Sequence, residues 1–200
     1  MLNNPGARQV ITAVLQPPAK FLLRIKVSPD AITVLGTLGV VLSALICFPQ
    51  DRLILGSLLI TAFTLTDLLD GTMARLAGTS GPWGNFLDAT LDRVADGAIF
   101  ASFIWWALVN DQLGVGLAAS LALVTGQVTS YAKARAEAVG ATANVGIAER
   151  AERLIIVLAA AFFTGFGVPY VLPIALWIIG ILGVITIVQR IVHVRGQLRT

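Results

Sequence analysis

Five aspartates lie close together in a part of the chain that is otherwise strongly hydrophobic: Asp67, Asp70, Asp88, Asp92 and Asp96. At 3.6 residues per helical turn, the first two share one face of a helix, and the other three share one face of the next. A lone charged residue at the centre of a bilayer costs about 2.5–3.5 kcal/mol, so these carboxylates need counter-charges or metal ions. Oxygen ligands favour hard cations, so the pattern indicates a site for Mg²⁺ or Mn²⁺. A cation transporter is the other class of protein that could use such a cluster.

The elements that must position these aspartates are membrane helices. Of the 200 residues, 56% are hydrophobic and 12% are charged, whereas about a quarter of the residues in soluble domains are charged. The apolar residues form blocks long enough to cross a bilayer, which takes about 20 residues of helix. We therefore predict an all-α integral membrane protein with six transmembrane helices, at about 31–47, 53–77, 85–109, 113–138, 148–166 and 169–193.

An N-terminal amphipathic helix is predicted ahead of these spans, because residues 8–27 mix apolar side chains with basic ones. We expect residues 1–200 to form one domain, with an interfacial segment at 1–27 and a six-helix core at 28–200. Of the 14 Lys and Arg residues, all except Arg52 lie on one side of the predicted spans. The positive-inside rule makes that side cytoplasmic. We therefore expect a protein of the cytoplasmic membrane with both termini and the aspartate cluster on the cytoplasmic side.

Cys47 is the only cysteine, so the chain forms no internal disulfide, and its apolar surroundings predict a small buried residue. The chain shows no internal repeat, whereas transporters usually have inverted repeats and broken helices at the midplane. This favours a fixed metal site over a transport pathway. Membrane lipids are the expected surroundings, and no nucleic-acid partner is expected.

The aspartate spacing belongs to a longer pattern. The sequence reads Asp67-x-x-Asp70-Gly71-x-x-Ala74-Arg75, then eight residues, then Gly84-x-x-x-Asp88-x-x-x-Asp92. This pattern resembles the signature of the CDP-alcohol phosphotransferase family, and all eight defining residues are present. The resemblance implies six transmembrane helices after an interfacial segment, and a homodimer. It also implies a reaction in which the phosphatidyl group of CDP-diacylglycerol passes to an alcohol and CMP leaves.

The same resemblance implies roles for individual residues. Two divalent ions, Mg²⁺ or Mn²⁺, would be held by Asp67, Asp70, Asp88 and Asp92. Asp92 would also be the catalytic base that takes the proton of the acceptor hydroxyl. CDP-diacylglycerol would be bound by Gly71, Ala74, Arg75, Asp30, Thr33, Thr79 and Ser80. Asp96 lies outside the motif, and a buried hydrogen bond between helices is its favoured role, with support of the metal site as the alternative.

Basic residues from three predicted helices bear on the acceptor, because a phosphorylated alcohol needs cations and a neutral one does not. The stretches 133–137 and 149–158 resemble the bacterial phosphatidylinositol phosphate synthases, a branch of the family that uses inositol 1-phosphate. The 139–145 loop departs from them, because it is less polar and less glycine-rich. By this resemblance the acceptor phosphate would be bound by Lys133, Arg153 and Arg190, with Arg135 and Arg150 as further candidates. The alternative is a phosphatidylglycerophosphate synthase, whose acceptor, glycerol 3-phosphate, is also anionic.

Overall fold

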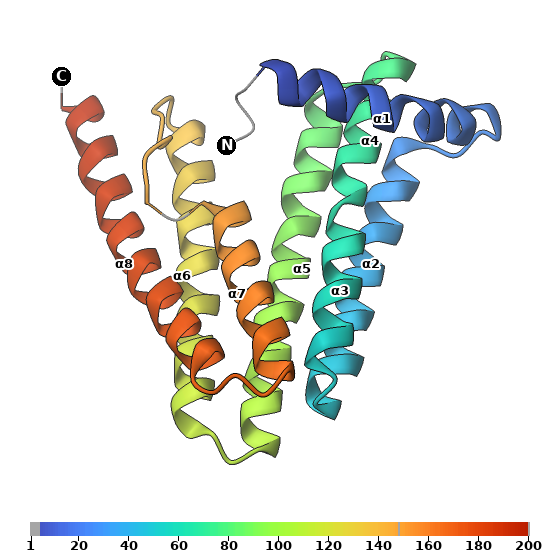
Figure 1. Ribbon diagram of the computed structural model, residues 1–200. Helices are drawn as coiled ribbons and strands as arrows, with labels where there is room; N and C mark the ends of the chain where they lie inside the picture. The colour runs from blue at the N-terminus through green and yellow to red at the C-terminus, as the bar shows by residue number, and fades with distance from the viewer. Residues whose placement is uncertain (1–4, 148, 200) are drawn as a thin grey trace. The chain divides into compact units, whose positions relative to one another are not determined.

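The computed structural model describes residues 5–147 and 149–199, and every regular element in these residues is a helix (Figure 1). This confirms the all-α fold. A short 3₁₀ turn at Phe48–Gln50 follows the second helix. The α-helices are α1 (Pro5–Arg24), α2 (Pro29–Cys47), α3 (Leu53–Thr64), α4 (Thr66–Ala77), α5 (Pro82–Val109), α6 (Leu113–Ala138), α7 (Arg150–Gly165) and α8 (Val171–Leu198).

Four stretches of the described residues are long and apolar enough to cross a membrane. They are Pro29–Gln50, Leu53–Ala77, Leu113–Ala138 and Val171–Leu198. The other two predicted spans correspond to α5 and α7. Helix α5 has 28 residues, with four charged residues among its first fifteen, and α7 has only 16 residues, about 24 Å at 1.5 Å per residue. The six-span arrangement stays a prediction, and residue 148 of the predicted fifth span lies outside the described residues.

Helix α1 covers most of the predicted interfacial segment, whose first four residues lie outside the described part. Side chains are described from residue 14 onward. Ala19 is fully buried, whereas Val14, Phe21 and Ile25 are largely exposed. An apolar surface of this kind suits the boundary between headgroups and acyl chains. The interfacial position of α1 itself stays a prediction.

The predicted span 53–77 matches a stretch that is long and apolar enough to cross a membrane, and within it the helix is interrupted at Leu65, between α3 and α4. The hydroxyl of Thr66 donates to the carbonyl of Phe63 over 2.6 Å, a side-chain bond to the backbone that bends helices. The interruption starts a new helix at Thr66 and places Asp67 in its first turn. A carboxylate is favoured at that position by the helix dipole.

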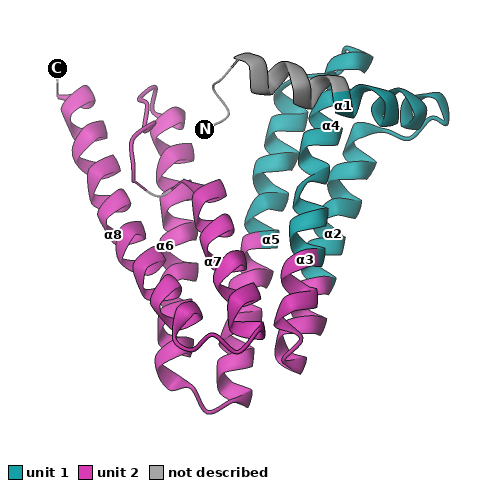
Figure 2. Ribbon diagram, in the orientation of Figure 1, with its two compact units in different colours: residues 1–42, 59–95 teal, residues 43–58, 96–200 magenta. Residues whose placement is uncertain are grey.

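The chain divides into two compact units (Figure 2). The first comprises residues 1–42 and 59–95, which include α1, most of α2, α4 and the start of α5. Helix α1 packs against α4. Helix α2 approaches the end of α3 and the start of α4 through Gly36 and Gly39, where an added Cβ would overlap Thr66 and Phe63 respectively.

The second unit comprises residues 43–58 and 96–200 (magenta in Figure 2). Helix α8 packs against α6 and α7, and Gly180 lies so close to α6 that an added Cβ would be 2.9 Å from Leu121. The rings of Phe48 and Phe103 are stacked with their centroids 4.4 Å apart. Cys47 is a free, buried cysteine, as predicted.

Candidate metal and active site

Three carboxylates of the first unit converge on one point. Asp67 lies in the first turn of α4, and Asp88 and Asp92 lie one turn apart on α5. Each offers an oxygen within 4.8 Å of the other two, and all three side chains are half-buried. Carboxylate oxygens are the ligands that hard divalent cations prefer. Like charges packed this closely repel one another unless a cation neutralises them, so the donor set fits a divalent metal ion.

Asp70, the fourth predicted metal ligand, is not part of this group of three. Its carboxylate is 8% exposed, and its Oδ2 accepts a hydrogen bond of 2.6 Å from the hydroxyl of Thr33 on α2. Such a short O–H···O⁻ bond is of the charge-assisted kind. Thr33 was predicted to bind the donor, and in the structure its hydroxyl holds one oxygen of Asp70. Asp70 as a metal ligand stays a prediction.

The predicted donor-binding residues of α4 and the loop after it lie at a surface. An added Cβ on Gly71 would meet only Arg75 Nη1, at 3.6 Å, so the backbone is open beside that guanidinium. Arg75 Nη2 also donates to the hydroxyl of Thr72 over 2.9 Å. Ala74 is half-buried. Two further predicted residues of this group, both exposed, are Thr79 and Ser80.

Trp83 is a residue that the sequence reasoning missed. It lies in the first turn of α5, directly before Gly84 of the motif, and its indole Nε1 donates to Asp30 Oδ2 over 2.8 Å. Asp30 itself lies in the first turn of α2, where Ser28 Oγ accepts a hydrogen bond from the backbone N–H of Ala31. The available signal was a tryptophan, an aromatic residue with a hydrogen-bond donor on its ring, directly before the first residue of the second half of the motif.

The predicted acceptor residues belong to the second unit, and three of them are held by hydrogen bonds or ion pairs. Arg150 Nε lies 3.0 Å from Asp96 Oδ1, and Arg153 Nη2 lies 3.7 Å from Asp96 Oδ2. This confirms the buried hydrogen bond between helices expected of Asp96. Arg190 donates through Nε to the carbonyl of Val145 over 3.0 Å and through Nη1 to that of Thr129 over 2.6 Å.

Burial separates the basic residues into two groups. Arg153 is 3% exposed and Arg190 is 7% exposed, which is unusual for guanidinium groups. By contrast, Lys133 and Arg135, near the end of α6, are exposed. The two buried arginines therefore have fixed positions, which suits the recognition of a defined anion.

The comparison with known proteins identifies the class. The sequence matches the CDP-alcohol phosphatidyltransferase family over residues 26–189, so the chain belongs to this family. The family resemblance predicted from the motif is confirmed, and the chain is a membrane enzyme of phospholipid synthesis rather than a transporter.

Two similar relatives within the family are both phosphatidylinositol phosphate synthases. A phosphatidylinositol phosphate synthase of Streptomyces avermitilis is 49% identical over 202 aligned residues, which cover 97% of this chain and 83% of that protein. One of Mycobacteroides abscessus is 44% identical over 191 residues, or 94% of this chain and 87% of that protein.

A solved structure of the phosphatidylinositol phosphate synthase PgsA1 of Mycobacterium tuberculosis, with CDP-DAG bound, is similar to this fold with a TM-score of 0.88. It is 42% identical, and the match covers 91% of this chain and 94% of that chain. A second structure of that enzyme, in complex with manganese and citrate, has a TM-score of 0.86 and 43% identity, and covers 90% and 88% of the two chains.

Proposed function

We propose that this enzyme transfers the phosphatidyl group of CDP-diacylglycerol to inositol 1-phosphate, giving phosphatidylinositol phosphate and CMP. The observation that carries the proposal is the similarity to phosphatidylinositol phosphate synthases at 44–49% identity over more than nine-tenths of the chain. CDP-diacylglycerol as donor is supported by the M. tuberculosis structure that contains CDP-DAG.

The reaction would be a single in-line displacement. The acceptor hydroxyl oxygen forms a bond to the phosphorus that carries the diacylglycerol, and the bond from that phosphorus to the oxygen of CMP breaks. Asp92 accepts the proton of the hydroxyl, as general acid–base catalysis requires. Divalent ions held by the aspartates would neutralise charge on the diphosphate and on the CMP that leaves.

We propose that Asp67, Asp70, Asp88 and Asp92 hold two such ions, Mg²⁺ or Mn²⁺. The convergence of three of these carboxylates within 4.8 Å supports this, as does the manganese in a structure of the M. tuberculosis relative. Asp70 would join the other three through its second carboxylate oxygen, Oδ1, while Thr33 holds Oδ2.

The donor would be bound at the surface of the first unit. Gly71 leaves the backbone of α4 open beside Arg75, whose planar guanidinium can hold a phosphate oxygen. We assign the nucleotide and diphosphate to Ala74, Asp30, Thr79 and Ser80 of this surface as well. Thr33, the remaining predicted residue, is buried and would act there through the Asp70 carboxylate that its hydroxyl holds.

The acceptor phosphate would be bound by Arg153 and Arg190, whose burial lets a charge-assisted bond act in a region of low dielectric. Arg190 keeps Nη2 for this purpose, because the two carbonyls engage Nε and Nη1. Arg150 lies on the first turn of α7 with Arg153. The exposed cations Lys133 and Arg135 complete the proposed set.

We further propose that residues 1–200 form one domain in which α5 and α7 also cross the bilayer, so that six helices span it. The aspartates of α5 then lie toward one membrane surface, and α1 lies in the interface. The distribution of basic residues supports a cytoplasmic position for the active site and both termini in the cytoplasmic membrane. The family resemblance supports a homodimer.

Release of CMP by the purified protein tests the proposed function. CDP-diacylglycerol and Mg²⁺ are supplied together with inositol 1-phosphate, glycerol 3-phosphate or free inositol in parallel reactions. The proposal expects release with inositol 1-phosphate alone. Release with glycerol 3-phosphate alone would keep the chemistry and refute the acceptor, and an Asp88→Asn variant controls for CMP formed by other proteins.

A further inference from the structure

Asp96 joins two arginines of another helix in a buried place. Its carboxylate on α5 is 5% exposed, and its two oxygens divide between two guanidinium groups on the first turn of α7. Oδ1 accepts from Arg150 Nε at 3.0 Å, and Oδ2 lies 3.7 Å from Arg153 Nη2. All three residues lie in the second unit, so this geometry is internal to one compact body.

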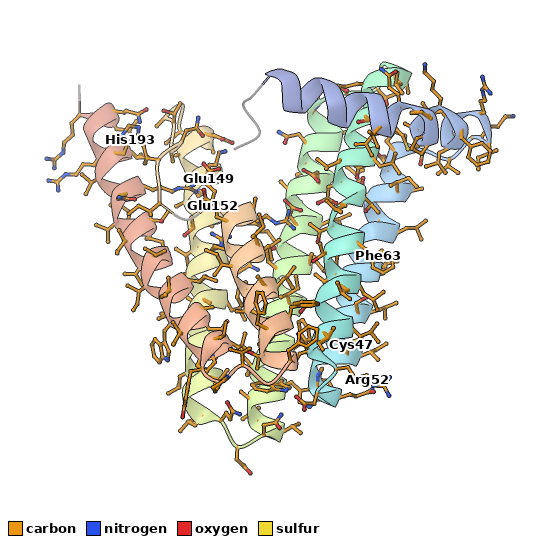
Figure 3. All side chains as sticks on the ribbon, in the orientation of Figure 1. Cys47, Arg52, Phe63, Glu149, Glu152 and His193 are labelled. Atoms are coloured by element: carbon orange, nitrogen blue, oxygen red, sulfur yellow. The ribbon has the colours of Figure 1, made fainter. Side chains whose placement is uncertain are left out.

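The two arginines occupy an unfavourable position for cations. The N-terminal end of a helix carries a partial positive charge, which disfavours Arg and Lys and favours anions. Glu149 and Glu152 form a capping box at this end of α7, where the backbone N–H of Glu149 donates to Glu152 Oε2 over 3.1 Å (Figure 3). Two cations remain in the same turn despite the dipole, and Asp96 is the carboxylate that bridges them.

The guanidinium of Arg153 is confined on two sides. Asp96 lies on the side of α5, and on the side of α6 an added Cβ on Gly126 would be 3.6 Å from Arg153 Nη2 and 3.7 Å from its Cζ. The separation of 3.7 Å from Asp96 Oδ2 is longer than the 2.7–2.9 Å of a full charge-assisted bond. Asp96 thus forms a longer ion pair with Arg153 than with Arg150.

We propose that Asp96 is a positioning residue for the acceptor. It fixes Arg153 so that the guanidinium receives the phosphate of the incoming alcohol. By accepting from Nε of Arg150, it also keeps Arg150 from taking the place of Arg153. This inference rests on the proposed function, in which Arg153 binds the acceptor phosphate. It adds a role for a residue that lies outside the aspartate motif, one turn after Asp92 on α5.

Asp96→Asn tests the role by separating the two substrates. The Asn side chain has nearly the same shape but presents an N–H where Oδ2 faced Arg153. We expect the KM for inositol 1-phosphate to rise about tenfold, because a misplaced Arg153 guanidinium loses a hydrogen bond to the charged acceptor phosphate. The KM for CDP-diacylglycerol should stay within twofold. An unchanged or lowered acceptor KM overturns the inference, because a carboxylate that only weakened the local positive field would give that result.

Asp51→Asn is the matched control. Asp51 Oδ1 accepts a hydrogen bond of 2.8 Å from Trp106 Nε1 in the same unit, so the substitution weakens a comparable tertiary contact away from the arginines. We expect both KM values to stay within twofold. If Asp51→Asn raises the acceptor KM as much as Asp96→Asn does, the effect is one of general stability and the inference fails.

A comparison within the Arg153→Gln background keeps the test valid if Asp96→Asn alone does not fold. The double variant removes both charges of the Asp96–Arg153 pair, and so avoids an isolated buried charge between them. If Asp96 acts through Arg153, the Arg153→Gln variant and the double variant have the same acceptor KM. Where turnover is too slow, they have the same affinity for inositol 1-phosphate by calorimetry. A further loss in the double variant shows an independent role and overturns the inference.

The outcome also separates this inference from the proposed function. Wild-type activity with inositol 1-phosphate together with a normal acceptor KM in Asp96→Asn refutes the inference alone. Wild-type activity with glycerol 3-phosphate only refutes the proposed acceptor, and the KM comparison is then made with that phosphate.

Discussion

Replacing Thr33 with Val tests whether the hydroxyl that holds Asp70 serves the metal site. Thr33 and Asp70 are both less than a tenth exposed, so water does not readily replace the bond of 2.6 Å between Thr33 Oγ1 and Asp70 Oδ2. The same hydroxyl lies 3.2 Å from the carbonyl of Pro29, and the carboxylate is the closer and the charged acceptor, which favours it for the single proton. Val keeps the shape of Thr and replaces the hydroxyl with a methyl group, so the hydrogen bond to Asp70 is lost.

The expected magnitude follows from the kind of bond. A hydrogen bond to a charged group contributes about 1.5–3 kcal/mol. If all of it serves to orient Asp70 as a ligand, metal affinity falls roughly 10- to 150-fold, at about 1.4 kcal/mol per factor of ten. Groups that orient metal ligands typically contribute about 10- to 100-fold. We therefore expect the Mn²⁺ concentration for half-maximal CMP release to rise at least tenfold, with most of the rate recovered at saturating metal.

Thr125→Val is the control for this experiment. Thr125 is also buried, but its hydroxyl donates to the carbonyl of Leu121 in its own helix, over 2.9 Å. The metal dependence of this variant should match that of the wild type. An unchanged Mn²⁺ midpoint in Thr33→Val, accompanied by a lower melting temperature, would show that the bond to Asp70 is structural and would refute the reasoning.

Three further substitutions test other parts of the structure. Asp92→Asn should lower kcat at least about 100-fold at saturating metal while CDP-diacylglycerol still binds, because it removes the base; loss of binding with a normal rate would contradict this. Trp83→Phe removes the N–H that holds Asp30 and should raise the KM for CDP-diacylglycerol roughly fivefold without changing that of the acceptor. Gly39→Ala should lower the free energy of unfolding by about 1–3 kcal/mol, because its Cβ would overlap the ring of Phe63; Gly114→Ala, which meets nothing within 4 Å, is its thermal-melting control.

The sequence predicted the parts of the site that depend on local periodicity. Asp88 and Asp92 are four residues apart, so any helix through them places both on one face, and they converge with Asp67 as expected. The break at Leu65 was not predicted, because hydropathy across residues 53–77 is continuous and a side-chain bond to the backbone has no periodic signal. The start of α7 was placed two residues early, because the reciprocal cap of Glu149 and Glu152 sets it.

Partners that are distant in sequence were beyond prediction from one chain. Thr33 and Asp70 are 37 residues apart, Asp30 and Trp83 are 53 apart, and Asp96 and Arg150 are 54 apart. Each pair joins two helices whose facing side chains are set by packing rather than by spacing. The motif indicated which aspartates matter, and only the fold shows what holds each one.

These partners explain how the chain keeps so many charged groups in membrane helices. Asp70 is offset by a hydroxyl, Asp96 by two guanidinium groups, and Arg190 by two backbone carbonyls. In the group of Asp67, Asp88 and Asp92, three like charges lie within 4.8 Å of one another and repel, and Arg93 lies 3.9 Å from Asp92. A divalent cation at the point where the three carboxylates converge would turn their mutual repulsion into attraction. The divalent metal therefore completes the structure of this site as well as its chemistry.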